Sequence, residues 1–231
     1  MIEGLLLVNK PLDWTSFDVV NRLRGLIAQS INVKSRSVKV GHSGTLDPFA
    51  SGLLIILIGK NYTKKSAELL KYDKTYQVVA RLGQKSSTGD TEGKIEDVST
   101  IKPSLSQIKQ TLSLFTGQLQ QTPPVYSAIK INGQRAYKLA RSGDIPQMPV
   151  KTVQIYQIEL QEYIYPTINF LARVSSGTYV RSLVSDIGDK LNVGAYTQEL
   201  RRTKIGQYDI KNAIEMDNID FPTICQNLII L

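Results

Sequence analysis

The longest uninterrupted run of aliphatic residues in the chain extends from Leu53 to Ile58. A helix needs ~20 apolar residues to cross a bilayer, so this run is far too short to be a membrane span. Its length and its β-branched isoleucines favour a strand in the centre of a sheet, although periodicity alone does not exclude a buried helix. The N-terminal residues, Met1 to Gly4, lack the basic region of a signal peptide. We therefore expect a soluble, cytoplasmic protein.

Other segments show strand and helix patterns that follow one another without a regular order. Strand patterns occupy residues 5–8, 75–82 and 168–174. Helix patterns, with apolar residues at helical spacing, begin after Thr15, after Ser104 and after Gly177. The chain contains neither a G-x-G-x-x-G nor a Walker motif, which argues against a dinucleotide or nucleoside triphosphate fold. The patterns together predict an α+β fold.

The charge balance of the chain is basic, with 28 Lys and Arg residues against 20 Asp and Glu and a formal net charge of +8. This excess suits a polyanionic partner such as nucleic acid, although many basic proteins bind none. Cys225 is the only cysteine and His42 the only histidine. An intramolecular disulfide and a Cys/His metal cluster are therefore excluded. A magnesium site made of carboxylates is the alternative, but nothing in the sequence points to one, and we expect no metal site.

A glycine-rich segment, residues 41–54 with the sequence GHSGTLDPFASGLL, surrounds the dipeptide Asp47-Pro48. Pro48 restricts Asp47 to extended or turn conformations, and the glycines allow the backbone of a ligand to approach closely. A rigid loop could thus hold the Asp47 carboxylate outward. On these residues alone, an Asx-type turn that leads into the next strand is the simpler interpretation.

The same segment carries a family resemblance. Matching blocks lie at 10–11, 15–16, 74–76, 81–93, 123–130, 177–183 and 200–206. With G-H-x-G-T-L-D-P-x-A-x-G-x-L at 41–54, these blocks resemble the TruB family of pseudouridine synthases over most of the chain up to Gly206. The resemblance implies the pseudouridine synthase fold, a mixed, largely antiparallel central sheet flanked by helices.

The expected domain organisation is one catalytic domain over residues 1–231, because no repeat or linker interrupts the chain. The segment 119–149, rich in Gln, Pro, Gly and Ser, is typical of a surface insertion. In the family, an insertion at this place is mobile and clamps the T arm of tRNA. Many members also have a C-terminal PUA-like domain, and we expect it to be absent because few residues follow Arg202.

The reaction implied by the resemblance is the isomerisation of uridine to pseudouridine at position 55 in the T loop of tRNA. The uracil leaves C1′ of its ribose, turns, and rejoins the sugar through carbon. By resemblance Asp47 is the catalytic nucleophile, either by attack at C1′ or in a glycal route that begins with proton loss at C2′. Arg181 is expected to keep Asp47 ionised and to orient it, because a guanidinium holds a carboxylate through paired hydrogen bonds. Without the family context, a surface ion pair would be the simpler role for Arg181.

The other catalytic and substrate-binding residues also follow from the resemblance. The Tyr76 ring is expected to stack on the flipped base rather than act as a base, because a phenol with a pKa near ~10 is weakly basic at neutral pH. Tyr179 is expected beside the base, and Leu200 is expected to line the uracil pocket. His42 is expected in the space that the flipped base vacates, although a structural histidine is the alternative.

RNA contacts beyond the pocket are expected along residues 125–141, where Lys130 and Arg141 belong to a basic stretch without acids. A solvated helix between two turns is the alternative. The expected partner is the T stem-loop of tRNA, with no membrane and no obligate protein partner, and the expected state is a monomer. The reaction is redox-neutral and uses no group donor, so we expect no cofactor.

Two other functions compete with this interpretation. A glycoside hydrolase or nucleosidase would also use a carboxylate at an anomeric carbon, but it needs a second one, and Asp90 and Glu92 lie in an expected loop. A catalytically idle RNA-binding protein would tolerate the loss of Asp47. The presence of Asp47, Tyr76 and Arg181 together argues against such decay.

Overall fold

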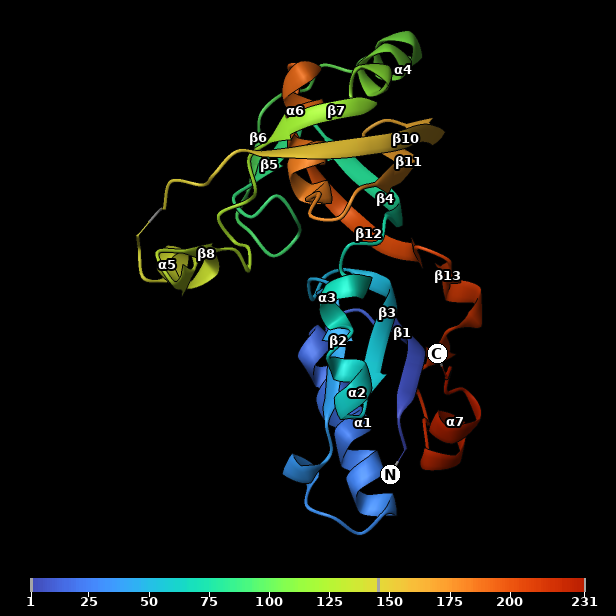
Figure 1. Ribbon diagram of the computed structural model, residues 1–231. Helices are drawn as coiled ribbons and strands as arrows, with labels where there is room; N and C mark the ends of the chain where they lie inside the picture. Colours follow the sequence, from blue (N-terminus) through green and yellow to red (C-terminus); the bar gives the residue numbers. More distant parts are fainter. Residues whose placement is uncertain (1, 145, 231) are drawn as a thin grey trace. The chain divides into compact units, whose positions relative to one another are not determined.

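The computed structural model describes residues 2–144 and 146–230, which pack as two compact units (Figure 1). Unit 1 contains the residues up to Tyr76 and those from Arg201 onward, and unit 2 contains residues 77–200. The chain enters unit 2 along strand β4 (Lys74–Leu82) and returns along strand β12 (Ala195–Ile205). None of the helices in the described part of the chain combines the length and hydropathy needed for a membrane span.

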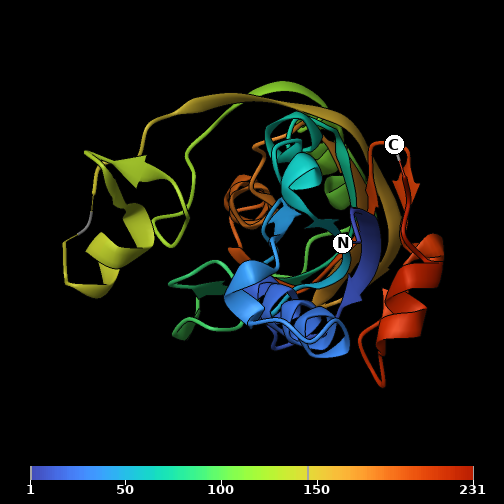
Figure 2. The ribbon, with the colours of Figure 1, turned by 60° about the horizontal axis from the view of Figure 1, so that its bottom comes forward.

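Unit 1 is built around the aliphatic run of the sequence. Its first elements are β1 (Gly4–Lys10), α1 (Ser16–Ser30), the 3₁₀ helix η1 (Ser35–Ser37), β2 (Val40–Ser43), β3 (Ser51–Ile58), α2 (Lys60–Thr63) and α3 (Ser66–Leu69). The C-terminal part adds β13 (Tyr208–Asp209), the 3₁₀ helix η2 (Ile210–Asn212), β14 (Ile214–Glu215) and α7 (Phe221–Gln226). Helix α7 lies to the right of β1 in both views of the ribbon (Figures 1 and 2).

Strand β3 occupies the middle of the sheet in unit 1. It pairs antiparallel with β1 on one side and with β2 on the other, and it runs parallel to β12 at Ser51 and Gly52. Leu54 and Ile56 point into a core cluster with α1, whereas Leu53 and Ile55 point into a second cluster that includes Tyr208. Both faces of β3 are therefore covered, which explains why its sequence is aliphatic without alternation. The prediction of a central strand at Leu53 to Ile58 is confirmed.

Helix α1 begins where the sequence predicts. Thr15 is its N-cap: the Thr15 hydroxyl accepts a hydrogen bond from the Asp18 N–H at 3.1 Å, and the Asp18 carboxylate accepts one from the Thr15 N–H at 2.8 Å. This reciprocal pair satisfies two backbone donors that the first helical turn leaves open. The apolar stripe of α1, including Val20, Leu23 and Ile27, then packs on the sheet.

Unit 2 holds a second part of the sheet, in the strand order β4-β11-β10-β7. Its elements after β4 are β5 (Gln84–Ser86), β6 (Ile95–Asp97), α4 (Leu105–Leu114), β7 (Gly117–Gln121), β8 (Lys130–Ile131), β9 (Gln134–Arg135), α5 (Ala136–Arg141), β10 (Lys151–Ile164), β11 (Thr167–Val174) and α6 (Val180–Lys190). Strand β10 pairs antiparallel with both β11 and β7. Helix α4 packs against β10 and α6.

The expected elements of unit 2 are present, and so is the expected fold class. Residues of β4 and β11 alternate between buried and more exposed positions, with Val78 and Phe170 among the buried ones. Helix α4 starts after its N-cap Ser104, and α6 starts three residues after Gly177. Parallel pairs, such as β1 with β14, occur beside antiparallel ones, so the fold is α+β with a mixed sheet and flanking helices.

The segment expected as an insertion, 119–149, begins inside the sheet. Leu119 pairs with Val153 and Gln121 pairs with Lys151, so the first residues of the segment belong to β7. The residues that follow form the small hairpin of β8 and β9 together with α5, and this group stands away from the sheet of unit 2 in both views (Figures 1 and 2). One catalytic domain and an RNA-clamping role for this segment both stay predictions.

Candidate active site

The Asp47 loop, residues 44–50 between β2 and β3 in unit 1, is anchored on both sides of the aspartate. The Ser16 hydroxyl accepts a hydrogen bond from the Leu46 N–H at 2.9 Å and lies 3.2 Å from the Leu46 carbonyl oxygen. The Lys10 ammonium donates to the Pro48 carbonyl oxygen at 3.3 Å. Asp47 itself is partly exposed. The backbone neighbours of Asp47 are thus held by buried side chains, and Asp47 between them is only partly buried.

Lys10 is a fully buried lysine whose ammonium also donates to the carbonyl oxygens of Pro11 at 2.7 Å and Trp14 at 2.6 Å. The pKa of Lys10 is lowered to about 8, mainly by burial and in smaller part by the Arg202 charge, whereas the Asp13 and Asp47 carboxylates oppose the shift. Asp47 and Lys10 therefore interact electrostatically, and the loop has a buried cation beside it.

His42 lies on β2, where it pairs with Ile56 of β3. Within the described part of the chain, its Nδ1 atom is buried and has no hydrogen-bond partner. Burial, followed by the positive charge of Arg202, lowers the pKa of His42 below its usual value. The imidazole is therefore neutral at physiological pH, which suits contact with a base better than contact with a phosphate.

Tyr76 stands on the buried face of β4, and only 8% of its surface is exposed. Two residues earlier, the buried Lys74 ammonium donates to the carbonyl oxygens of Leu70 at 2.6 Å and Tyr72 at 2.5 Å. This contact fixes the turn from which β4 starts, and so it fixes the position of Tyr76. Burial lowers the pKa of Lys74 to about 8, and Arg202 again adds to the shift.

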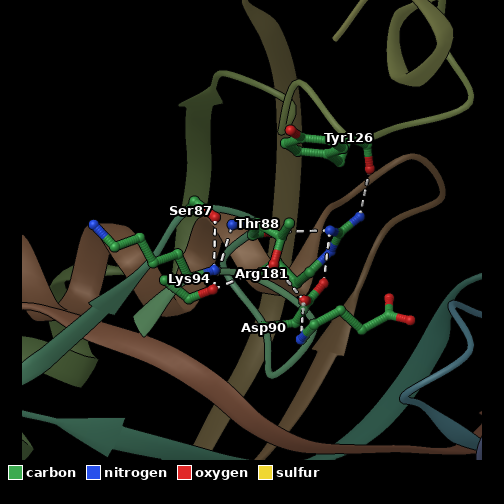
Figure 3. Close-up of polar contacts among 8 residues, drawn as sticks. Ser87, Thr88, Asp90, Lys94, Tyr126 and Arg181 are labelled. Atoms are coloured by element: carbon green, nitrogen blue, oxygen red, sulfur yellow. Dashed lines mark hydrogen bonds and ion pairs between the residues drawn. The ribbon is translucent and has the colours of Figure 1, made fainter. Parts of the chain in front are cut away.

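Arg181, in the first turn of α6 in unit 2, is buried and surrounded by acceptors (Figure 3). Its Nη1 donates to Asp90 Oδ2 at 2.8 Å and to the Thr88 carbonyl oxygen at 3.0 Å, and its Nη2 donates to the Tyr126 carbonyl oxygen at 2.8 Å. Asp90 is fully buried and also accepts hydrogen bonds from the Thr88 hydroxyl and the Glu92 N–H. A surface ion pair is therefore not the role of Arg181.

Asp90 was not expected as the partner of Arg181. The sequence places it in a loop, and only the match of residues 81–93 to the family pattern marks that loop as more than a connection. Asp90 forms an isolated parallel β-bridge with Thr197 of β12, and the Gly89 carbonyl oxygen accepts a hydrogen bond from the Thr197 N–H at 2.9 Å. The loop is therefore an integral part of unit 2.

Tyr179 is the N-cap residue of α6, and a buried glutamine holds its backbone. Gln121 Oε1 accepts from the Tyr179 N–H at 2.8 Å, and Gln121 Nε2 donates to the Tyr179 carbonyl oxygen at 3.1 Å. Sequence reasoning missed Gln121, which lies in a polar stretch with no pattern that marks it. Leu200 lies on β12 and is buried.

Lys130 and Arg141 lie in the segment that stands away from the sheet of unit 2, in β8 and α5, and both are exposed. The Arg141 guanidinium lies 5.8 Å from the centre of the Tyr137 ring. Exposed cations beside an aromatic ring suit a nucleic acid, because phosphates and bases are recognised by these two chemistries.

The candidate residues are thus divided between the two units. Unit 1 contains His42, Asp47 and Tyr76. Unit 2 contains Tyr179, Arg181, Leu200, Lys130 and Arg141. The anchored loop of Asp47 and the buried guanidinium of Arg181 are each well defined, and the pairing between them remains a prediction.

Two protein-family models together match most of the chain. Residues 30–180 match the TruB family pseudouridylate synthase (N terminal domain), and residues 181–223 match the tRNA pseudouridylate synthase B C-terminal domain. The chain is 42% identical over 229 residues to tRNA pseudouridine synthase B of Protochlamydia amoebophila, covering 99% of this chain and 84% of that protein. It is 43% identical over 218 residues to tRNA pseudouridine synthase B of Chlorobaculum tepidum, covering 93% and 88%.

Two solved structures share the fold. A Cbf5-Nop10-Gar1 complex matches with a TM-score of 0.67 and 28% identity, over 92% of this chain and 52% of that chain. An H/ACA RNP bound to a substrate RNA containing 2'-deoxyuridine matches with a TM-score of 0.65 and 27% identity, over 92% and 51%. The chain spans about half the length of these solved chains.

The mixed sheet with flanking helices is therefore the fold of the pseudouridine synthases. Within that class, the chain belongs to the TruB family. It is an isomerase that acts on uridine in tRNA.

Proposed function

We propose that the enzyme forms pseudouridine at position 55 in the T loop of tRNA, with Asp47 as its nucleophile. The observation that supports this role is the anchoring of the Asp47 loop. Hydrogen bonds hold the backbone of Leu46 and of Pro48, while the Asp47 side chain between them stays partly exposed. A carboxylate held on a fixed backbone is suited to attack at one sugar carbon, because little conformational freedom is lost in the reaction.

The reaction needs an anion beside the anomeric carbon. The C1′–N1 bond breaks, the uracil turns, and a bond forms between C1′ and C5, while the C5 proton is lost and N1 gains one. In one route Asp47 attacks C1′, and in the other a glycal forms after proton loss at C2′. Asp47 serves in either route, since the sugar becomes electron-poor in the first and loses a proton in the second.

Arg181 is proposed to complete the site by facing Asp47. A closed site removes water from the carboxylate and raises its pKa unless a cation compensates. The Arg181 guanidinium is itself fixed, since Asp90, Thr88 and Tyr126 accept its hydrogen bonds. A cation with a fixed orientation stabilises an anion without reorganising during the reaction.

The target nucleotide is proposed to be flipped out of the T loop. Tyr76 would stack on the base, with Tyr179 and Leu200 completing an apolar pocket around it. The neutral imidazole of His42 would occupy the space left by the base, where its buried Nδ1 gains a partner. Lys130 and Arg141 would bind phosphates of the T stem. We further propose that the enzyme acts as a monomer in the cytoplasm.

A hydrolytic reaction at C1′ is less consistent with the described residues. Such a reaction needs a second carboxylate as general acid or base. Asp90 was one of the two acids available for this role, but it is fully buried and forms an ion pair with Arg181. Its pairing leaves it unsuited to proton transfer.

The test uses a T-arm stem-loop that carries tritium at C5 of the target uridine. We expect Asp47→Asn to release no tritium while it binds the RNA nearly as tightly as the wild type does. Asn keeps the size of the side chain and removes the anion, so the variant separates chemistry from binding. Full turnover by Asp47→Asn would remove the nucleophile assignment. Turnover at a uridine outside the T loop would remove the site assignment.

A further inference from the structure

Arg202, on β12 in unit 1, is a large and fully buried side chain with 1% of its surface exposed. Its Nε donates to the Leu53 carbonyl oxygen at 2.8 Å and its Nη2 to the Gly44 carbonyl oxygen at 2.9 Å. Its Nη1 lies 3.5 Å from the Thr45 carbonyl oxygen. All three acceptors are backbone atoms, and they lie on both sides of Asp47 in the sequence.

One guanidinium thus joins the first residues of the Asp47 loop to the strand that follows the loop. Gly44 and Thr45 precede Asp47, and Leu53 follows it in β3. A planar fork with fixed donor directions sets the distance between its acceptors more strictly than a flexible ammonium does. Because Gly44 and Leu53 are attached to the same rigid group, Arg202 restricts the positions that Asp47 between them can take, in addition to the contacts of Ser16 and Lys10.

The backbone of Arg202 packs against the start of β3, the strand that follows the loop. Arg202 pairs with Gly52 in the parallel ladder of β3 and β12. A Cβ atom at Gly52 would lie 2.3 Å from the Arg202 carbonyl oxygen and 2.7 Å from its N atom, and Gly52 has a φ of +110°. Only glycine permits this close approach. The backbone from which the Arg202 side chain projects therefore lies directly against that of Gly52.

Arg202 is also a buried positive charge. Within residues 2–144 and 146–230, Arg202 forms no ion pair with a carboxylate, and its hydrogen bonds go to carbonyl oxygens. Burying a cation in this way is costly, and a neutral amide would donate to carbonyls at lower cost. The Arg202 charge lowers the pKa of Lys10, of His42 and of Lys74. Its charge therefore reaches Lys10, which contacts the Asp47 loop, and two residues on the strands β2 and β4.

We propose that Arg202 is the positioning residue of Asp47: it holds the ends of the Asp47 loop at a fixed separation and supplies a positive charge behind the carboxylate. This inference rests on the proposed role of Asp47. It assigns to Arg202 a part in the rate of the chemical step, distinct from binding of the RNA and from folding.

The experiment compares Arg202→Met, which removes the fork and the charge, with Arg202→Lys, which keeps the charge. Both are measured in single-turnover reactions with saturating T-arm RNA, together with the dissociation constant for the RNA. We expect Arg202→Met to slow the chemical step ~100-fold, since a displacement of about 1 Å at a reacting group has an effect of this size. Binding of the RNA should change little. Arg202→Lys should have an intermediate rate, because an ammonium cannot reproduce the fork.

The pH dependence of the rate separates the two roles of Arg202. Loss of the cation makes ionised Asp47 less favourable, so the acid limb of the rate profile should move to higher pH in Arg202→Met. In Arg202→Lys the charge remains, and the acid limb should stay at its wild-type position although the rate is lower. A residue that only supported the fold would leave the acid limb unmoved in both variants.

Two further variants serve as controls, one for loss of stability and one for loss of a charge. Leu23→Ala removes a buried side chain of α1 from a core cluster that includes no residue of the loop, and it should lower the stability while the folded protein keeps the wild-type rate. Arg201→Met removes one positive charge at the neighbouring exposed position. A wild-type rate and profile in Arg202→Met would overturn the inference, as would an equal loss of rate in Leu23→Ala. If Arg202→Met does not fold, a wild-type rate in Arg202→Lys overturns the positioning role.

The inference and the proposed function fail in different ways. If Asp47→Asn keeps full activity, the role of Asp47 is wrong, whatever Arg202 does. If Asp47→Asn is inactive while the Arg202 variants react at the wild-type rate, the role of Asp47 stands and only the positioning role of Arg202 is wrong.

Discussion

The Arg181 guanidinium lies 2.8 Å from the Asp90 carboxylate at a place where both side chains are almost completely buried. A buried pair of this kind adds little net stability, since desolvation of both groups offsets their attraction. Its effect is on geometry. Asp90 is itself held by hydrogen bonds from Thr88 and Glu92, and together with the Thr88 and Tyr126 carbonyl oxygens it fixes the plane of the Arg181 guanidinium.

Replacing Asp90 by Asn should impair both stability and turnover. The amide has nearly the same shape, but it leaves the Arg181 cation buried without an anion, which costs about 3–5 kcal/mol in comparable pairs. We expect the free energy of unfolding in urea to fall by about this amount. We also expect the single-turnover rate to fall at least ~10-fold, because a guanidinium without its anchor no longer has one orientation.

The ion pair between Lys85 and Asp189 offers a matched control in the same unit. Its atoms lie 2.6 Å apart, but about half of each side chain is exposed. Asp189→Asn makes the same chemical change at a hydrated pair and should alter the stability by no more than ~1 kcal/mol, with an unchanged rate. Equal effects of the two substitutions would show that burial of the Arg181–Asp90 pair matters neither for stability nor for the rate.

A second prediction concerns the two buried lysines of unit 1. The pKa of Lys10 and that of Lys74 are both lowered to about 8 from the ordinary value of 10.5, mainly by burial. Between these pH values the unfolded chain binds more protons at the two sites than the folded protein does. Their contribution to stability is therefore greatest above pH 10.5 and is lost as the pH falls to about 8.

Urea unfolding at a series of pH values tests this linkage. The free energy of unfolding should rise between pH 8 and pH 9.5, by at most about 1.4 kcal/mol per pH unit for each lysine. In Lys74→Met the rise should be shallower, because one of the two titrating groups is gone. Lys71→Met, at an exposed position nearby, is the control and should leave the slope unchanged. A fall in stability over this range in the wild type would contradict the prediction.

Features that depend on local pattern could be predicted from the sequence. The run Leu53 to Ile58 is a central strand because apolar side chains cover both of its faces, and Thr15 caps α1 because its hydroxyl and the Asp18 carboxylate are three positions apart. Strand β10, by contrast, was not expected. Its register shifts between Ile155 and Gln157 and between Leu160 and Glu162, and such bulges interrupt the alternation that marks a strand.

The candidate site was predictable to the extent that it depends on motif residues. Asp47, Tyr76 and Arg181 were recognised by resemblance. Asp90 and Arg202 also lie in matching blocks, but their roles as anchors were not predicted. Arg202 donates only to backbone carbonyls, and Gln121 binds the backbone of Tyr179. A carbonyl oxygen is present in every residue, so the sequence contains no signal for a side chain that binds one from a distant part of the chain. These contacts become visible only in the folded structure.

The last prediction concerns binding of the RNA by Lys130 and Arg141. Both are exposed in the segment that stands away from the sheet of unit 2. If each contacts one phosphate, Lys130→Ala and Arg141→Ala should weaken binding of the T-arm RNA, and each should reduce the slope of log affinity against log salt by about 1. The dissociation constant at several salt concentrations gives both quantities.

A charge elsewhere in unit 2 provides the control. Lys94 is exposed and pairs with Glu96 beside the β5–β6 hairpin, and Lys94→Ala should leave the salt slope unchanged. The rate of the bound complex should also be unaffected in Lys130→Ala and Arg141→Ala, because phosphate contacts position the RNA and take no part in the chemistry at C1′. A lower single-turnover rate at saturating RNA, with an unchanged salt slope, would instead indicate that the segment acts on the active site.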